Sequence, residues 1–203
     1  MPAPVTRGCR VAALVLAAGS SRRMGGVNKL LQPVGGIAML RRAVNAALAS
    51  RCTSVLVVTG AEADAVEACL GGLEVQFVHN PEHASGMASS LRRGLAALPA
   101  DADAAVVVLA DMPWIDGGHV DRLFAAFDPR QPKIIAPVRA GRRGNPILWP
   151  REFFAEMMAV EGDVGARELL QRHASRVEAV AFDDDAIFAD VDTPAALEES
   201  KLR

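Results

Sequence analysis

The sequence lacks several features that would place it in a common class of protein. No stretch approaches the roughly 20 consecutive apolar residues that a membrane-spanning helix needs, so we expect no membrane insertion. It also has no block of basic residues, because cations and anions are interspersed along the chain to a net charge of -2. Nucleic-acid binding requires clustered positive charge, so nucleic acid is not an expected partner.

Cysteine is scarce as well. Cys9, Cys52 and Cys69 are odd in number and widely spaced, a pattern that fits neither a disulfide framework nor a zinc site. They are expected to be small, partly buried thiols in a reducing compartment. The apolar run at 11–18 is short and continues directly into a glycine-bearing loop, so we read no signal peptide there and expect a cytoplasmic protein.

The sequence does contain the pattern of an α/β fold. With 203 residues, 51% of them hydrophobic, the chain suits a single domain over 1–203 with its core at about 10–200. The β-rich runs are almost continuously apolar, which predicts a mostly parallel central sheet flanked by helices on both faces. The expected strands are 11–16, 55–59, 75–78, 105–110, 134–138, an antiparallel 145–149, and 177–182; the expected helices are 39–49, 62–70, 87–98, 118–127, 151–158, 164–173 and one from 194.

The loop after the first expected strand has the composition of a phosphate-binding segment. Small residues from Leu16 onward allow the backbone to approach a triphosphate, while Arg23 and Lys29 supply positive potential. The segment has neither the G-x-G-x-x-G of dinucleotide folds nor the G-K-[ST] of a P-loop. The alternative interpretation is a glycine-rich surface turn with solvated arginines.

A second polar position follows the strand expected at 105–110. Asp111 comes at its carboxyl end, which is where open α/β sheets bind their ligands. A carboxylate there can hold Mg²⁺, which attack on an α-phosphate needs in order to neutralise the triphosphate and help pyrophosphate depart. Alternatively, Asp111 only caps the helix that begins after Met112.

Together these segments resemble a known family. The run L-A-A-G-x-S-x-R-M-G…K and the later D-M-P are similar to the signatures of nucleotidyltransferases with a glycosyltransferase-A-like fold, in particular molybdenum cofactor cytidylyltransferases. One departure is that three residues, 26–28, separate Gly25 from Lys29, where two are common. The resemblance implies catalytic roles for Lys29, Arg23 and Asp111, and nucleotide contacts by Leu16, Ala17, Ala18, Gly19, Ser21 and Gly25.

Four later segments extend the resemblance over most of the chain. They are N-P at 80–81 with G-M-A-S-S-L at 86–91, G-x-x-G-N-P at 141–146, G-D-x-G-A-R at 162–167 and D-x-D-T-P at 190–194. Helix capping is the rival interpretation for the segment at 86–91, for Asp163 and for Asp192, and a solvated side chain is the rival for Arg167. The resemblance implies binding roles for Asn80, Gly86, Ser89, Ser90, Asn145, Asp163 and Arg167, and a second metal ligand in Asp192.

The resemblance also implies a reaction and its partners. CMP would pass from CTP to molybdenum-bound molybdopterin in the presence of Mg²⁺, and the product would serve a xanthine-dehydrogenase-type molybdoenzyme. The related guanylyltransferases usually carry Leu-Ala-Gly-Gly, and the methyl of Ala18 leaves less room beside the base, which favours CTP. The alternatives are a guanylyltransferase for the same cofactor, a sugar-phosphate nucleotidyltransferase, a dinucleotide-binding redox protein and a cofactor-insertion chaperone.

Overall fold

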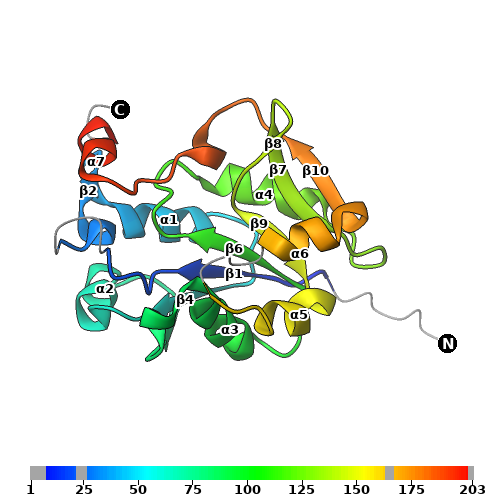
Figure 1. Ribbon diagram of the computed structural model, residues 1–203, viewed down its shortest axis with the longest axis horizontal. Helices are drawn as coiled ribbons and strands as arrows, with labels where there is room; N and C mark the ends of the chain where they lie inside the picture. The colour runs from blue at the N-terminus through cyan, green and yellow to red at the C-terminus, as the bar shows by residue number, and fades with distance from the viewer. Residues whose placement is uncertain (1–7, 22–26, 163–166, 201–203) are drawn as a thin grey trace.

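The protein is built around one large central sheet. The computed structural model describes residues 8–21, 27–162 and 167–200. Eight strands form the sheet in the order β10-β7-β9-β6-β1-β4-β5, with the short β8 paired to β7 alone. In Figure 1 this sheet runs through the middle of the molecule, with α1 and α4 on one side of β1 and β6 and with α3 and α5 on the other.

The strand directions confirm the mostly parallel sheet that the apolar runs predict. β1 pairs in parallel with β4 and β6, β4 with β5, and β7 with β10. β9 runs antiparallel between β6 and β7, as expected from the polar turn before it. The strands are β1 (Val11–Leu16), β4 (Ser54–Thr59), β5 (Gln76–His79), β6 (Ala104–Leu109), β7 (Ile134–Arg139), β8 (Arg142–Arg143), β9 (Ile147–Pro150) and β10 (Val177–Ala181).

Two apolar clusters form the core, one on each face of the sheet. Successive side chains of β1 point to opposite faces, so Val15 joins the cluster under α1 (Met39–Leu48) and α4 (Gly117–Ala126). Leu14 joins the cluster under α3 (Met87–Ala97) and α5 (Phe154–Met158). A Cβ on Gly94 of α3 would collide with the Leu14 side chain, so this helix packs very closely on the sheet.

A hairpin that the sequence pattern does not predict lies between η2 (Lys29–Leu31) and α1. Gly35 and Gly36 both have positive φ angles, 58° and 79°, and connect β2 (Pro33–Val34) to β3 (Ile37–Ala38). Glycine favours such two-residue turns because it has no Cβ to clash at positive φ. Strands of two residues are too short to show a periodicity, which is why the pattern missed them.

The remaining elements are short. No helix in the described part of the chain combines the length and apolar character that would let it cross a membrane. The remaining helices are α2 (Ala63–Cys69), α6 (Arg167–Arg172) and α7 (Pro194–Ser200), and the short 3-10 turns are η3 (His83–Ser85), η4 (Arg151–Phe153), η5 (Ala174–Arg176) and η6 (Ala186–Phe188).

Candidate nucleotide and metal site

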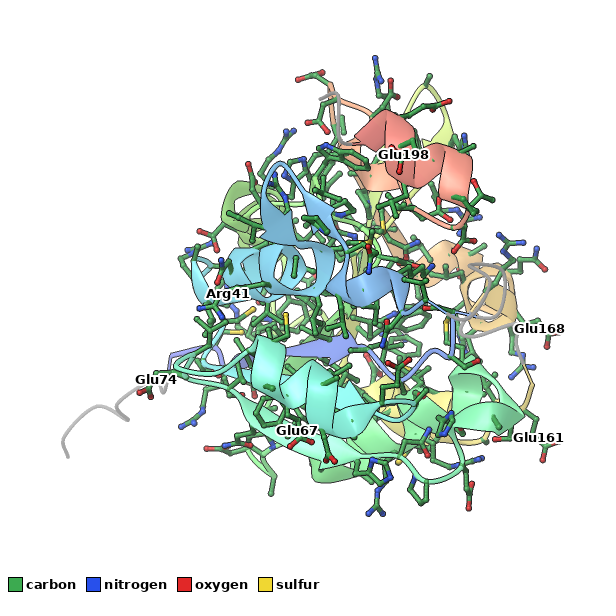
Figure 2. All side chains as sticks on the ribbon, turned by 90° about the vertical axis from the view of Figure 1, so that its left-hand side faces the viewer. Arg41, Glu67, Glu74, Glu161, Glu168 and Glu198 are labelled. Carbon is green, nitrogen blue, oxygen red and sulfur yellow. The ribbon has the colours of Figure 1, made fainter. Side chains whose placement is uncertain are left out.

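A cavity of about 530 Å³ opens beyond the carboxyl ends of β1 and β6. This is the edge at which open α/β sheets bind ligands, and the volume is typical of small-molecule sites. Figure 2 views the molecule from the side toward which β1 points; the labelled Glu198 lies in the upper part of that view, on α7, and Glu67 in the lower part, on α2. Of the residues expected from the sequence, the cavity is lined by Leu16, Ala18, Gly19, Ser21, Lys29, Gly86, Ser90, Asp111 and Asp192.

Three charged side chains from distant parts of the chain meet in this cavity. The Lys29 Nζ lies 2.8 Å from Oδ2 of Asp111 and 2.5 Å from Oδ1 of Asp192. Burial by itself would lower the pKa of Lys29, but the two carboxylates outweigh it and raise that pKa above its ordinary value. Lys29 is therefore a charged ammonium at neutral pH that bridges two carboxylates.

The backbone of Lys29 is fixed by its neighbours. Its N–H donates to the Ser21 Oγ at 3.1 Å, and Ser21 itself has a positive φ of 48°. The buried Asn28 caps η2, because its Oδ1 accepts from the Leu30 N–H at 3.1 Å. Sequence reasoning did not single out Asn28, although asparagine directly before a short helical turn is a capping signal. Ser21 and Asn28 thus position Lys29 at the cavity.

The two carboxylates are held close to each other by the backbone. The N–H of Val191 donates to the carbonyl oxygen of Asp111 at 3.0 Å, which ties the segment carrying Asp192 to the end of β6. The Asp111 Oδ1 is buried and has no hydrogen-bond partner within the described ranges. An unpartnered carboxylate oxygen beside a second carboxylate suits a hard divalent cation.

The protein offers this cation two carboxylates rather than a complete cage. Among the described residues, no group of three or more His, Cys, Asp or Glu side chains is arranged to hold a metal ion. Mg²⁺ usually takes one or two carboxylates and completes its coordination with water and substrate phosphates. Asp111 and Asp192 therefore fit a metal that arrives together with a nucleotide.

Asn80 lies behind the cavity and braces its wall. It is buried, and its Nδ2 donates to the Oγ atoms of Ser89 and Ser90 at 2.9 and 3.0 Å. Its Oδ1 accepts from the Glu82 N–H at 3.0 Å. Of these side chains, the serine at position 90 lines the cavity, whereas Asn80 and Ser89 are not in its described lining.

The wall that Asn80 braces contributes two residues to which the resemblance assigned no role. His83 and Met87 line the cavity, from η3 and from the first residue of α3. Between them Gly86 adopts φ 110°, which a residue with a Cβ rarely adopts. The glycine in this motif therefore has a conformational reason as well as a place in the cavity.

The other predicted residues lie elsewhere. Asn145 is outside the described lining, and its N–H donates to the Ile187 carbonyl at 2.9 Å, so the turn at 141–146 packs on the segment that leads to Asp192. Arg167 is exposed at the start of α6. Ala17 is buried beside the cavity with its N–H bonded to the Val58 carbonyl. Arg23, Gly25 and Asp163 fall outside the described residues.

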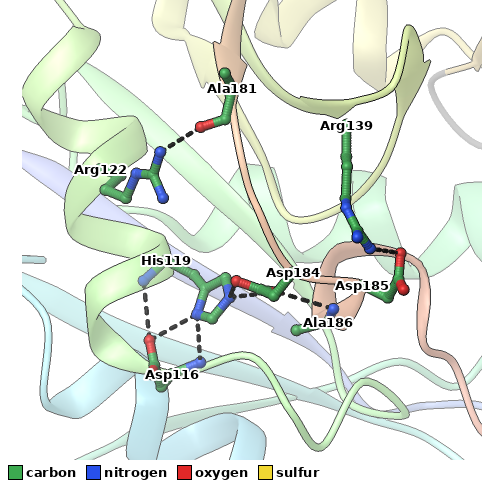
Figure 3. A network of polar contacts seen from close by, with 8 residues as sticks. All are labelled: Asp116, His119, Arg122, Arg139, Ala181, Asp184, Asp185 and Ala186. Carbon is green, nitrogen blue, oxygen red and sulfur yellow. Dashed lines mark hydrogen bonds and ion pairs between the residues drawn. The ribbon is translucent and has the colours of Figure 1, made fainter.

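A polar clasp joins the chain after Asp111 to the chain before Asp192 (Figure 3). The two ring nitrogens of His119 face different carboxylates: Nδ1 lies 2.6 Å from Asp116 Oδ1, and Nε2 lies 3.1 Å from Asp184 Oδ1. Burial would raise the pKa of both carboxyl groups, but hydrogen bonding with His119 outweighs it, so both pKa values are below their ordinary range. The imidazole also stacks on Phe182, with 5.5 Å between ring centroids.

Comparison with known proteins places most of the chain in one family. Residues 13–177 match the family described as the MobA-like NTP transferase domain. The chain is 32% identical to the nicotine blue oxidoreductase of Paenarthrobacter nicotinovorans over 189 residues, covering 90% of this chain and 92% of that protein. It is 28% identical to a probable molybdenum cofactor guanylyltransferase of Natronomonas pharaonis over 204 residues, covering 94% and 96%.

Solved structures agree with this placement. The crystal structure of Rv0371c from Mycobacterium tuberculosis has a TM-score of 0.85 at 25% identity and covers 97% of this chain and 100% of that one. A manganese complex of the same protein has a TM-score of 0.80 at 25% identity, covering 95% and 98%. The glycosyltransferase-A-like nucleotidyltransferase fold expected from the sequence is confirmed, and the chain belongs to the family of MobA-like NTP transferase domains.

Proposed function

We propose that this protein transfers a nucleoside monophosphate from an NTP to the phosphate of a molybdopterin-type acceptor and releases pyrophosphate. The observation that carries the proposal is the meeting of Lys29, Asp111 and Asp192 in a cavity at the carboxyl edge of the sheet. Phosphoryl transfer depends on cations that neutralise the phosphates and on carboxylates that hold a metal. The family and the guanylyltransferase relatives support the same reaction class.

The proposed mechanism relies on alignment and charge neutralisation. Asp111 and Asp192 would hold Mg²⁺ or a similar cation, whose chemistry is to neutralise the triphosphate and stabilise departing pyrophosphate. Lys29, and by resemblance Arg23, contact the phosphates. An oxygen of the acceptor phosphate bonds to the α-phosphorus while the bond to the bridging oxygen of pyrophosphate breaks. The acceptor oxygen is already anionic, so no strong general base is needed.

We further propose CTP as the donor, on the basis of the wall formed by Ala18. This residue lines the cavity with only 3% of its surface exposed. A Cβ on the neighbouring Gly60 would collide with Ala18 and with His83, so the wall is closely packed from behind. Because this closely packed wall cannot shift to enlarge the cavity, it favours the smaller pyrimidine base. GTP is the competing donor, because several relatives are named molybdenum cofactor guanylyltransferase.

A competition assay decides between the donors. Equal concentrations of CTP and GTP are supplied with molybdopterin, and the dinucleotide product is identified by mass spectrometry. We expect mainly the cytosine product, and a shift toward guanine in Ala18→Gly. The matched control is Ala17→Gly, at a buried position outside the described lining. A mainly guanine product from the natural sequence would overturn the choice of CTP and leave the transfer reaction intact.

We propose that the dinucleotide product passes to a xanthine-dehydrogenase-type molybdoenzyme.

A redox function is the second candidate, because one relative at 32% identity is named an oxidoreductase. Hydride transfer from a bound dinucleotide does not call for paired carboxylates around a lysine, whereas nucleotidyl transfer does. The purified protein can be examined for flavin or nicotinamide absorbance and assayed in parallel for pyrophosphate release. Bound flavin or nicotinamide in protein that releases no pyrophosphate would favour the redox candidate.

A further inference from the structure

The position of the Lys29 ammonium has a consequence for how a metal reaches this site. Its Nζ contacts one oxygen of Asp111 and one of Asp192, and the three side chains are only 13%, 22% and 29% exposed respectively. The ammonium is thus a counter-ion of both carboxylates in a partly buried setting. In such a setting each charge is stabilised by its partner, and removing one partner leaves the other charge strongly destabilised.

A divalent cation bound by the same carboxylates would conflict with that ammonium. Mg²⁺ contacts its oxygen ligands at about 2.0–2.1 Å, which is closer than an ammonium approaches. A metal between Asp111 and Asp192 would therefore lie next to the Lys29 Nζ, and like charges at such short range repel strongly. A metal on the Asp111 Oδ1, which Lys29 does not contact, would still lie close to the ammonium on Oδ2, so the two cations compete for this carboxylate pair.

We propose that Lys29 is an internal competitor for the metal site, so that a divalent cation binds weakly alone and tightly together with a nucleotide. A triphosphate supplies the anionic oxygens to which the displaced ammonium moves. The inference rests on the proposed function, since it assumes a nucleotide in the cavity. It goes beyond that function because it assigns Lys29 an action before any nucleotide is bound.

The local structure is suited to such an exchange. The Lys29 backbone is held by the Ser21 hydroxyl, and Asn28 caps the turn that Lys29 begins. The side chain beyond it is a flexible four-carbon stem ending in a compact charge. The ammonium can therefore move from the carboxylates to phosphates in the same cavity without a change in the fold.

The test measures Mn²⁺ binding without turnover. Electron paramagnetic resonance measures the concentration of free Mn²⁺ in solutions of the protein with its natural sequence, of Lys29→Met and of the second neutral variant Lys29→Gln. Lys133→Met is the matched control, because it removes the same charge from an exposed pair with Glu178. We expect Mn²⁺ alone to bind about tenfold tighter or more in both Lys29 variants, since their carboxylates have lost their counter-ion. The control should stay within about twofold of the natural sequence, since the charge it removes is exposed.

Adding a non-hydrolysable CTP analogue completes the test. The analogue should tighten Mn²⁺ binding to the natural sequence by a larger factor than to Lys29→Met, because only the natural sequence has an ammonium to displace. Equal Mn²⁺ affinity in the natural sequence and the folded Lys29 variants would overturn the inference and leave the proposed function standing. No Mn²⁺ binding in any variant, with no pyrophosphate release by the natural sequence, would overturn both.

Discussion

Single charges, rather than a large apolar surface, define the candidate site at the residue scale. Lys29 begins a short turn, Asp111 follows a buried strand and Asp192 stands two residues before a helix. Each lies at the end of an element, where a side chain can face a ligand while the backbone is held by the fold. Changing such a residue should affect chemistry more than folding.

Asp111→Asn tests this separation most directly. The substitution preserves the shape of the side chain but removes the negative charge proposed to hold the metal, so turnover should fall about 100-fold or more. Circular dichroism and melting should show a retained fold. Pyrophosphate release measured over a range of Mg²⁺ concentrations gives the loss. Asp128→Asn is the control, at an exposed carboxylate paired with Arg130. Near-normal Mg²⁺-dependent turnover in folded Asp111→Asn would contradict the assignment.

Sequence reasoning located the charged residues more readily than it described their surroundings. Lys29, Asp111 and Asp192 were predictable because each stands in a recognisable motif at the end of an expected element. Asn80 and Ser89 stand in motifs too, yet in the structure their side chains bond to each other. A linear motif shows that a polar side chain is present, but not whether it faces a ligand or a neighbouring loop.

At the element scale, the strands were predictable because a short, almost continuously apolar run is typical of a strand buried on both faces. β1 and β6 agree with expectation to within a residue, since both are almost wholly buried. Tertiary connections were not predictable in the same way. The clasp through His119 joins α4 to the segment after β10, and nothing in the sequence around His119 indicates Asp184 as its partner 65 positions away.

The clasp gives a prediction for acid stability. The pKa values of Asp116 and Asp184 are lowered in the folded state. The contacts of these carboxylates with His119 therefore stabilise the fold completely at a pH above the unfolded-state pKa of about 3.9. That stabilisation is lost as the pH falls through the lower pKa values of the folded state. The natural sequence should therefore lose more unfolding free energy between about pH 5 and pH 3 than His119→Gln. The carboxylates are more than half exposed, so the difference should stay below about 1 kcal/mol.

Urea unfolding followed by tryptophan fluorescence at several pH values measures this difference. His79→Gln, at an exposed histidine of the edge strand β5, is the control and should follow the natural sequence. Parallel pH dependence in the natural sequence and in His119→Gln would show that the clasp contributes nothing to acid stability.

For the whole molecule, the central sheet connects the two apolar clusters. β1 lies between β4 and β6 and sends alternate side chains into both clusters, so neither cluster can be disrupted without affecting the strand they share. The candidate site depends on the same connection, because Asp111 follows β6, the neighbour of β1. We therefore expect the chain to unfold as one cooperative unit, as proposed for a single domain.

Leu14→Ala tests that cooperativity. Leu14 is fully buried in the cluster under α3, so its truncation should lower the unfolding free energy by about 2–5 kcal/mol through lost burial and a residual cavity. In a chain of this size that corresponds to a fall of about 5–15 °C in melting temperature. Differential scanning calorimetry should show one transition before and after the change. Ile37→Ala, at an apolar side chain that is 42% exposed, is the control and should shift the transition far less. If Leu14→Ala split the transition in two, the two faces of the sheet would be separate folding units, and loss of the cluster under α3 would leave the Asp111 end of β6 folded.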